Sequence, residues 1–238
     1  MALFKNDYQG GSHLEILSSQ GTTIKNWKLR GVKKIYQSDL KGSCHHVEGG
    51  KLNLPKNDKL HLYLYQPYLL FQLYITSGMP ISIELCLIDM NNNHRRFLIS
   101  TNNKETKTTA LHISCPFPDL IKGQWMNVCF DLVNLLSDNF KGFTYKRLDS
   151  IGLNGTFRLR KICTIKDRPP ETQMDNYSKY SDFKSIVELP KSILLPSDIL
   201  SSTIVYDMQR ILRIENRSLN TNDVIPAIIK HNIQFKLI

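Results

Sequence analysis

Short apolar runs, several of them alternating with polar residues, most constrain the fold of this chain. They lie between His13 and Ile165 and are separated by glycine, asparagine, proline and charged turns. This spacing predicts an all-β fold, an antiparallel sandwich or barrel. The predicted strands are HLEIL (13–17), LHLYLY (60–65), YLLFQLYI (68–75), ISIELCLI (81–88), RRFLIS (95–100), LHISC (111–115), WMNVCFDL (125–132), SIGLNG (150–155) and FRLRKICTI (157–165).

One helix is predicted among these strands. The segment DLVNLLSDNF (131–140) has its apolar residues at helical spacing, namely Leu132, Val133, Leu135 and Leu136. It would form a brief amphipathic helix that closes off the sandwich. Both tryptophans, Trp27 and Trp125, are assigned to the core.

The character of the chain changes after residue 167, where paired prolines, acidic residues and serines are typical of a linker. We therefore predict a β-sandwich domain over residues 1–167 and a linker with a C-terminal extension over 168–238, loosely ordered or docked as an accessory. Within the extension, residues 201–218 are predicted to form a helix capped by Ser201 or Ser202. Its apolar stripe would be Ile204, Met208, Ile211 and Leu212, extended by Ile214.

Positive charge is concentrated in the predicted domain. The whole chain has 31 Lys and Arg against 21 Asp and Glu, a formal net charge of +10. Residues 1–167 hold 22 basic and 13 acidic residues, a net charge of +9, and residues 168–238 hold 9 and 8, a net charge of +1. Such a field favours an acidic partner: a nucleic acid, an anionic membrane, or an acidic protein such as a microtubule wall.

Neither secretion nor membrane insertion is predicted. The N-terminal residues lack an apolar core of signal-peptide length, and no apolar run approaches the length of a membrane span. The five cysteines are odd in number, widely spread and never in a CxxC pair, so we expect them to be reduced and mostly buried. The expected location is the cytoplasm.

The sequence offers no constellation of catalytic residues. It contains no GxSxG, HExxH, GxxxxGKS/T or GxGxxG motif. Glu84 and Asp89 have no companion acid or base at an identifiable spacing. We predict that the protein is not an enzyme and has no cofactor.

A metal site at His45 and His46 is a weaker alternative. His61 or His112 could serve as further ligands, but adjacent residues on a strand point to opposite faces, so one ion could not use both imidazoles without a bulge. Ordinary surface or edge histidines are the favoured interpretation, and no metal site is predicted.

Two basic segments are the predicted partner-binding residues: Arg95, Arg96, Arg158, Arg160 and Lys161. Strand alternation would send Arg158 and Arg160 to one face, where two guanidinium groups suit carboxylates. Lys161 breaks the alternation and predicts a twist or bulge. The competing interpretation of each arginine is a solvated outer face that prevents edge-to-edge pairing.

These residues also carry a resemblance to a known family. FKNDYQGG (4–11), EILSSQG (15–21), Trp27, VEGGKLNLP (47–55), HRRFLIS (94–100), WMNVCFDL (125–132) and NGTFRLRKI (154–162) occur in this order. Together they resemble the domain of cilia- and flagella-associated protein twenty, from about Met1 to Asp167. The segments FKNDYQGG, SSQG and LRKICTIK are most similar to the longer paralogue, which carries this domain plus a C-terminal extension.

The resemblance implies a non-catalytic, jelly-roll-like β-sandwich similar in architecture to carbohydrate-binding modules. It also implies a role in cilia or flagella, basal bodies or centrioles. The compact member of the family helps to close the B-tubule onto the A-tubule at the inner junction of ciliary doublets, beside tubulin. A structural module that binds tubulin or another acidic microtubule-associated protein is thus the leading functional prediction, and the expected locations include the cytoskeleton, the cilium and the basal body.

Two other classes of function stay open. A nucleic-acid or chromatin-associated adaptor would use the same positive charge. A carbohydrate-binding module follows only from analogy of the fold, and would need a row of exposed aromatic rings, for which the candidates are Tyr63, Tyr65, Tyr68 and Tyr74.

Overall fold

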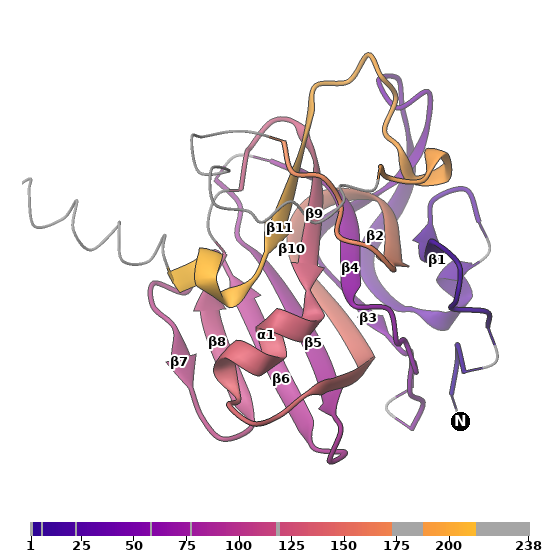
Figure 1. Cartoon of the computed structure of the whole chain (residues 1–238). Coiled ribbons are helices and arrows are strands. Elements are labelled where there is room, and N and C mark those ends of the chain that lie inside the picture. The colour runs from indigo at the N-terminus through magenta and orange to yellow at the C-terminus, as the bar shows by residue number, and fades with distance from the viewer. Residues whose placement is uncertain are drawn as a thin grey trace, which may run out of the picture.

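The structure is a computed structural model. It describes residues 2–5, 7–21, 23–57, 59–76, 78–117, 120–172 and 188–212. Figure 1 shows a β-rich molecule, in which one helix lies against the lower end of the strands.

Eleven strands form one continuous hydrogen-bonded sheet, ordered β11-β9-β4-β10-β5-β6-β8-β7, with β1 and β3 attached to β10 and β2 attached to β3. The prediction of an all-β fold is confirmed, but the sheet is mixed, because β11 pairs with β9, and β8 with β6, in parallel. The strands are β1 (His13–Ser18), β2 (Lys28–Gln37), β3 (Gly42–Leu54), β4 (Tyr68–Ile75), β5 (Ile81–Asp89), β6 (His94–Ser100), β7 (Lys107–Thr108), β8 (His112–Pro116), β9 (Trp125–Asp131), β10 (Tyr145–Ile165) and β11 (Ser201–Tyr206); the helices are η1 (Thr23–Asn26), α1 (Leu132–Asn139) and η3 (Lys191–Ile193).

Strand β10 runs through the whole sheet and holds it together. Residues 151–155 of β10 pair with both β3 and β5, and residues 157–159 pair with both β3 and β4. Strands β5 and β4 therefore share one edge of β10, while β3 and β1 share the other. The two predicted strands at 150–155 and 157–165 are in fact this single strand of 21 residues.

A bend at Gly155 allows β10 to pair with strands in both halves of the sheet. The pairing register with β3 shifts between Gly155 and Phe157, and Gly155 has a φ of 135°. A Cβ atom at this position would lie 2.3 Å from the backbone oxygen of Pro80. Only glycine combines this backbone angle with so close an approach.

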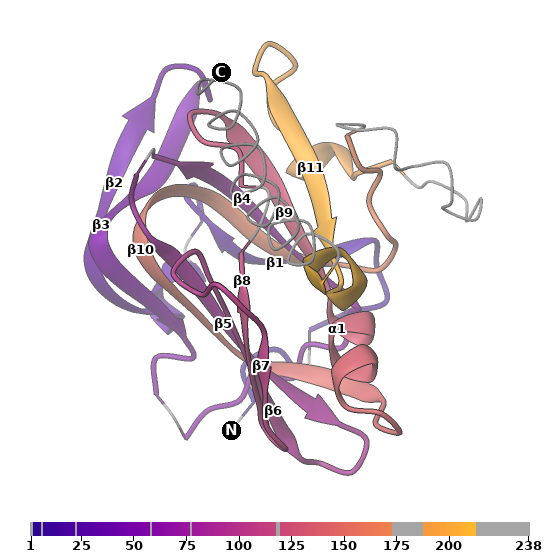
Figure 2. The same ribbon diagram turned by 90° about the vertical axis from the view of Figure 1, so that its left-hand side faces the viewer.

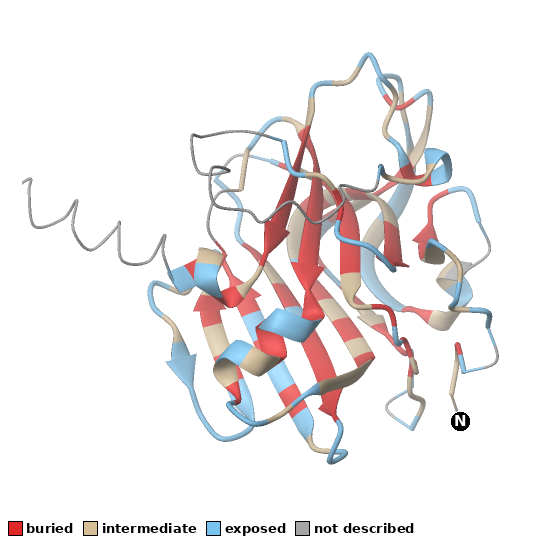
Figure 3. Cartoon of the chain, viewed as in Figure 1, coloured by how far each residue is buried: buried red, intermediate tan, exposed pale blue. Residues whose placement is uncertain are grey.

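The main core lies on the inner side of the curled sheet (Figures 2 and 3). It includes Leu85 and Phe97 from the β5–β6 half and Phe71 and Met126 from the β4–β9 half, all fully buried. Trp27 and Trp125 are 3% and 2% exposed, which confirms their burial. All five cysteines are buried, and none of them forms a disulfide bond.

Helix α1 confirms the helix predicted at 131–140. The Asp131 side chain caps it by accepting hydrogen bonds from the backbone N–H and the amide of Asn134. Leu132, Leu135 and Leu136 are buried, whereas Val133 is 37% exposed, contrary to its place in the predicted apolar stripe. No helix in the described part of the chain is long and apolar enough to cross a membrane.

The strand predicted at 60–65 is wrong. This segment forms only isolated bridges, at His61 and Leu64, and Tyr63 has a φ of 62°, which interrupts an extended conformation. Leu62 and Leu64 are nevertheless fully buried, because they reach the core from a loop that is tied to β10 by the Leu64–Leu148 bridge.

The helix predicted at 201–218 is also wrong at its start. Residues Ser201–Tyr206 form β11, paired in parallel with β9, and a helical turn begins only at Met208. The β-branched residues Thr203, Ile204 and Val205 suit a strand and are buried there. Residues 213–218 lie outside the described residues. The division of the chain at residue 167 stays a prediction.

The bend in β10 generates the first prediction. We expect Gly155→Ala to lower the free energy of unfolding by about 3 kcal/mol, because the methyl group would force β10 away from Pro80. Gly142→Ala is the matched control: φ is 84° but nothing lies within 4 Å of the added Cβ, so the loss should be about 1 kcal/mol. Urea denaturation measures both, and equal losses would contradict the clash.

Candidate protein-binding surface

Arg95 is buried inside the fold. It is 5% exposed, and its guanidinium group lies between the rings of Phe140 and Phe143, 4.5 Å and 4.2 Å from their centroids. The same group donates to Asp89 Oδ2 at 3.1 Å and to the Ala110 carbonyl. Its hydrogen-bonding and stacking capacity is used within the domain, so Arg95 does not belong to the accessible surface expected from the sequence.

Asp89 is the ionised partner of this arginine. Burial acts to raise the pKa of Asp89, but hydrogen bonds from the backbone and side chain of Asn93 and from Arg95 outweigh it, and the pKa lies below its usual value. The carboxylate therefore joins the turn after β5 to the start of β6.

Arg96 lies on the opposite, outer face of β6. Its side chain is 60% exposed, and the nearest acid is Glu84 on β5, at 3.8 Å. Among the five predicted residues, it is the one whose side chain is mostly in solvent. Adjacent strand residues point to opposite faces, which is why Arg95 and Arg96 have different roles.

Arg160 and Lys161 bind the C-terminal part of the chain itself. We call residues 188–200 the strap; it includes η3 and lies across the outer side of the sheet near β1 (Figure 1). Arg160 donates to Gln72 Oε1 at 2.8 Å and to the Leu194 carbonyl at 3.0 Å. Lys161 contacts Glu15 at 2.7 Å and the Ser192 carbonyl at 2.8 Å.

Arg158 is half-buried beside the strap. It donates to Gln37 at 3.1 Å and lies over the ring of Tyr74, 5.0 Å from its centroid. The predicted alternation is thus correct for Arg158 and Arg160, and the register with β4 does shift between Leu159 and Lys161. The hydrogen bonds and ring contacts of Arg158, Arg160 and Lys161 are made with other residues of the same chain.

Apolar contacts also hold the strap. Ile193 is fully buried against Leu70, Cys163 and Val205, while Leu195 and Ile199 pack beside Trp125. The amide of Gln72 donates to the Ile193 carbonyl at 2.5 Å. The outer face of β4, β9 and the C-terminal half of β10 is therefore a second, smaller core covered by the strap.

Exposed positive charge is concentrated instead in η1, β2 and β3. Residues 24–57 hold eight lysines and arginines against Asp39 and Glu48, a difference of +6. Lys41 pairs with Asp198 of the strap at 2.9 Å. We call the other seven the basic hairpin, and none forms an ion pair with another described residue: Lys25, Lys28, Arg30, Lys33, Lys34, Lys51 and Lys56.

Like charges face one another within the basic hairpin. Arg30 on β2 is directly opposite Lys51 on β3. Such pairs destabilise a sheet. Burial lowers the pKa of His45, and the charge of the facing Lys34 lowers it further, against an opposing hydrogen bond with Ser18. The local field is therefore positive, because the segment holds six more positive than negative side chains.

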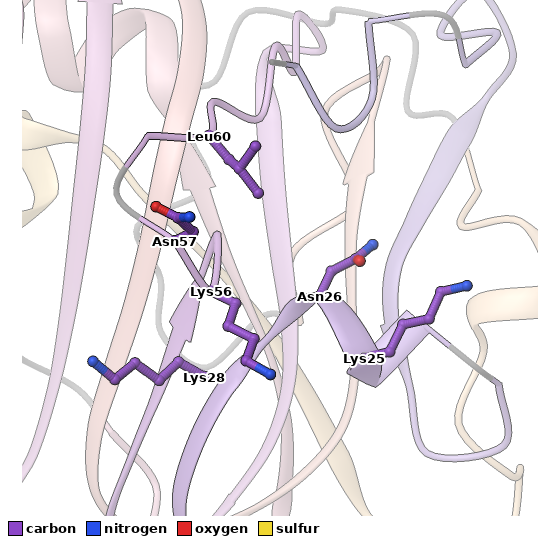
Figure 4. Close-up of a pocket in the computed structure, with 6 residues that line it drawn as sticks. All are labelled: Lys25, Asn26, Lys28, Lys56, Asn57 and Leu60. Atoms are coloured by element: carbon purple, nitrogen blue, oxygen red, sulfur yellow. The ribbon is translucent and has the colours of Figure 1, made fainter.

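The basic hairpin borders a shallow hollow of about 520 Å³ between η1 and the loop after β3. Lys25, Lys28 and Lys56 line it, and Figure 4 shows their side chains spreading in different directions around Asn26 and Asn57. The Lys56 N–H donates to the Asn26 carbonyl at 2.9 Å and so holds the two sides together. The hollow is basic and open.

Sequence reasoning missed the basic hairpin because β2 and β3 lack long apolar runs. The segment KLRGVKK (28–34) nevertheless has four positive charges in seven residues and no acid. A count of charge in short windows would have found it.

A second, smaller groove lies on the outer sheet face around Glu84, Cys86 and Arg96, with a volume of about 290 Å³. Burial raises the pKa of the Cys86 thiol to about 11, so it stays protonated near neutral pH and is a poor nucleophile. Within the described residues, no three His, Cys, Asp or Glu side chains gather as metal ligands.

The four candidate tyrosines do not form a row of exposed rings. Tyr68 and Tyr74, both on β4, are half-buried in the clusters beneath the strap. The ring of Tyr63 lies under Arg147, with its centroid 4.2 Å from the guanidinium carbon, and Tyr65 is 45% exposed. This placement does not favour the carbohydrate-binding alternative.

Comparison with known proteins identifies the family. The CFA20 domain matches residues 3–181, so the chain belongs to the CFA20 domain family, as its sequence landmarks predicted. The family name associates it with cilia and flagella. The special similarity to the longer paralogue stays a prediction.

Two solved structures share a limited likeness. The agarase AgWH50C is 8% identical, with a TM-score of 0.35, and the match covers 67% of this chain and 25% of the agarase. An exo-beta-agarase is 10% identical, with a TM-score of 0.34, and the match covers 69% and 26%. The chain thus spans about a quarter of each enzyme, and the likeness carries no functional inference.

The contrast between Arg95 and Arg96 is testable. We expect Arg95→Gln to lower the free energy of unfolding by about 3 to 5 kcal/mol, because Asp89 loses its buried partner. Arg96→Gln should change it by less than about 0.5 kcal/mol. Asp89→Asn added to Arg95→Gln should recover part of the loss. Chemical denaturation checks all three, and similar values for the two single variants would refute the assignment.

Docking of the strap is testable by hydrogen exchange. Ile193→Asp buries a charge where an apolar side chain packs, so residues 188–200 should detach and exchange their amide hydrogens faster while the inner core stays protected. Leu200→Asp, at a position 78% exposed, is the control and should leave the exchange unchanged. Unchanged exchange in the Ile193 variant would show that the strap is not held by this contact.

Proposed function

We propose that this protein is a non-catalytic binding module of ciliary or basal-body microtubules, which holds an acidic protein surface, most simply tubulin, against its basic hairpin. The observation that carries the proposal is the seven exposed positive side chains of the basic hairpin, on η1, β2, β3 and the loop after β3, none of which forms an ion pair with another described residue. Repulsion between Arg30 and Lys51 persists in the free protein and would be relieved by an anionic partner.

The position of the hairpin supports this role. Figure 2 shows β2 and β3 at the outer margin of the molecule, away from β11 and α1. The strap contacts the end of this hairpin at Ile35 and Lys41, whereas the seven side chains of the basic hairpin are exposed. Arg96 adds a positive group on an exposed part of the same sheet, on β6, whereas Arg95, Arg160 and Lys161 support the fold.

Membership of the CFA20 domain family supports the ciliary setting. The sequence contains no GxSxG, HExxH, GxxxxGKS/T or GxGxxG motif, which supports a role in binding rather than catalysis. The proposal therefore combines a ciliary family with a surface suited to acidic proteins.

Microtubule co-sedimentation tests the proposal. The triple variant Arg30→Glu, Lys33→Glu and Lys34→Glu should bind about tenfold or more weakly, and binding of the unmodified protein should weaken as salt is raised. The fold should persist, because Arg30→Glu places opposite charges across the ladder from Lys51.

The matched control reverses three exposed lysines elsewhere, Lys104, Lys122 and Lys141. It changes the net charge in the same direction and should retain most of the binding. Equal losses of binding in both variants would mean that only the net charge of the protein matters. Unchanged binding in both would show that the basic hairpin does not bind microtubules.

A further inference from the structure

Strand β2 is an open edge of the sheet. This strand is ten residues long and pairs with β3 alone. Successive backbone groups of a strand point alternately to its two sides, so about half of those in β2 face away from β3. None of these groups hydrogen-bonds to another described part of the chain. A partner strand could therefore pair with this edge through its main chain.

The usable part of this edge lies after Gly31. The register with β3 shifts between Arg30 and Val32, and Gly31 has a φ of 64°, so the strand is kinked there. From Val32 to Gln37 the pairing with β3 is regular. This leaves an uninterrupted stretch of six residues, long enough for a short strand to pair with.

Lys33 and Lys34 give this stretch a distinctive charge pattern. They face His46 and His45, respectively, and so project to opposite sides of the sheet. A strand added beside β2 would also alternate its side chains between these two sides. A peptide with an acid at every second position would satisfy only one of the lysines, whereas consecutive acids would meet both.

We propose that the β2 edge binds an extended peptide with a run of consecutive glutamates or aspartates, which adds to the sheet as a strand beside Val32–Gln37. This inference specifies the binding mode of the proposed acidic partner and rests on that proposed function. The main chain of the peptide pairs with β2, and its acids meet Lys33 on one side and Lys34 on the other, with Arg30 nearby.

The same lysines discriminate between partners. Two copies of β2 brought edge to edge would place positive charges together, which opposes self-association. The positive charges of Lys33 and Lys34 that repel a second copy of β2 attract an acidic strand. Charge thus selects the partner, and the open backbone edge provides the pairing.

Fluorescence anisotropy with synthetic peptides tests the proposal on the full chain. The probes are a peptide of consecutive glutamates, the same peptide with its central backbone nitrogens methylated, and a longer peptide with equal charge in which glutamate alternates with threonine. N-methylation keeps the charges but removes the main-chain donors. We expect the methylated and the alternating peptides to bind about tenfold or more weakly than the first.

Amide exchange locates the binding. Addition of the consecutive peptide should slow exchange within residues 32–37, and Lys33→Glu with Lys34→Glu should abolish both the protection and the binding. The control pair Lys104→Glu with Lys141→Glu should retain them.

The outcomes separate this inference from the proposed function. Equal binding of the consecutive and methylated peptides would overturn strand addition while leaving an electrostatic basic hairpin intact. Tighter binding of a single-stranded oligonucleotide than of the peptide would overturn it in favour of phosphate recognition. Microtubule binding that survives while no glutamate peptide binds would also overturn it, without removing the proposed function.

Discussion

Hydrogen bonding along both edges of β10 is the constraint on which the rest of the structure depends. This strand connects β3 and β1 on one edge to β5 and β4 on the other. The bend at Gly155 allows a single strand to belong to both halves of the curled sheet. The inner core closes between those halves, and the outer hairpin of β2 and β3 is carried on one of its edges.

Burial on both sides of β10 explains how the basic residues are used. Toward its C-terminal end, the inner face packs in the main core, while the outer face receives the strap. Arg160 and Lys161 therefore meet backbone carbonyls of the strap instead of solvent. The strap reaches the end of the β2–β3 hairpin at Ile35 and Lys41, but the seven side chains of the basic hairpin stay exposed. A basic side chain that lies under the strap stabilises the fold, whereas one that is exposed on the hairpin is available to a partner.

Local patterns predicted several elements well. YLLFQLYI corresponds to β4 over its full length, and Asp131 with the leucines that follow forms α1 as expected. The prediction was wrong for LHLYLY. Its alternating leucines at 62 and 64 are buried, as in a strand, but the positive φ of Tyr63 interrupts the extended backbone. It also missed β2, whose stability comes from pairing with β3 and not from an apolar run. A long strand rich in lysine has little local signal.

The sequence by itself determined the all-β class, the excess of positive charge in the first part of the chain and, through its ordered landmarks, the CFA20 domain family. These depend on residue type and spacing along the chain. Only the tertiary structure decided that Arg95 is buried between two aromatic rings while Arg96 faces solvent, and that Ser201–Tyr206 is a strand. Those outcomes depend on which segments meet in space, because burial, pairing and the partner of a charge are set by neighbours distant in sequence.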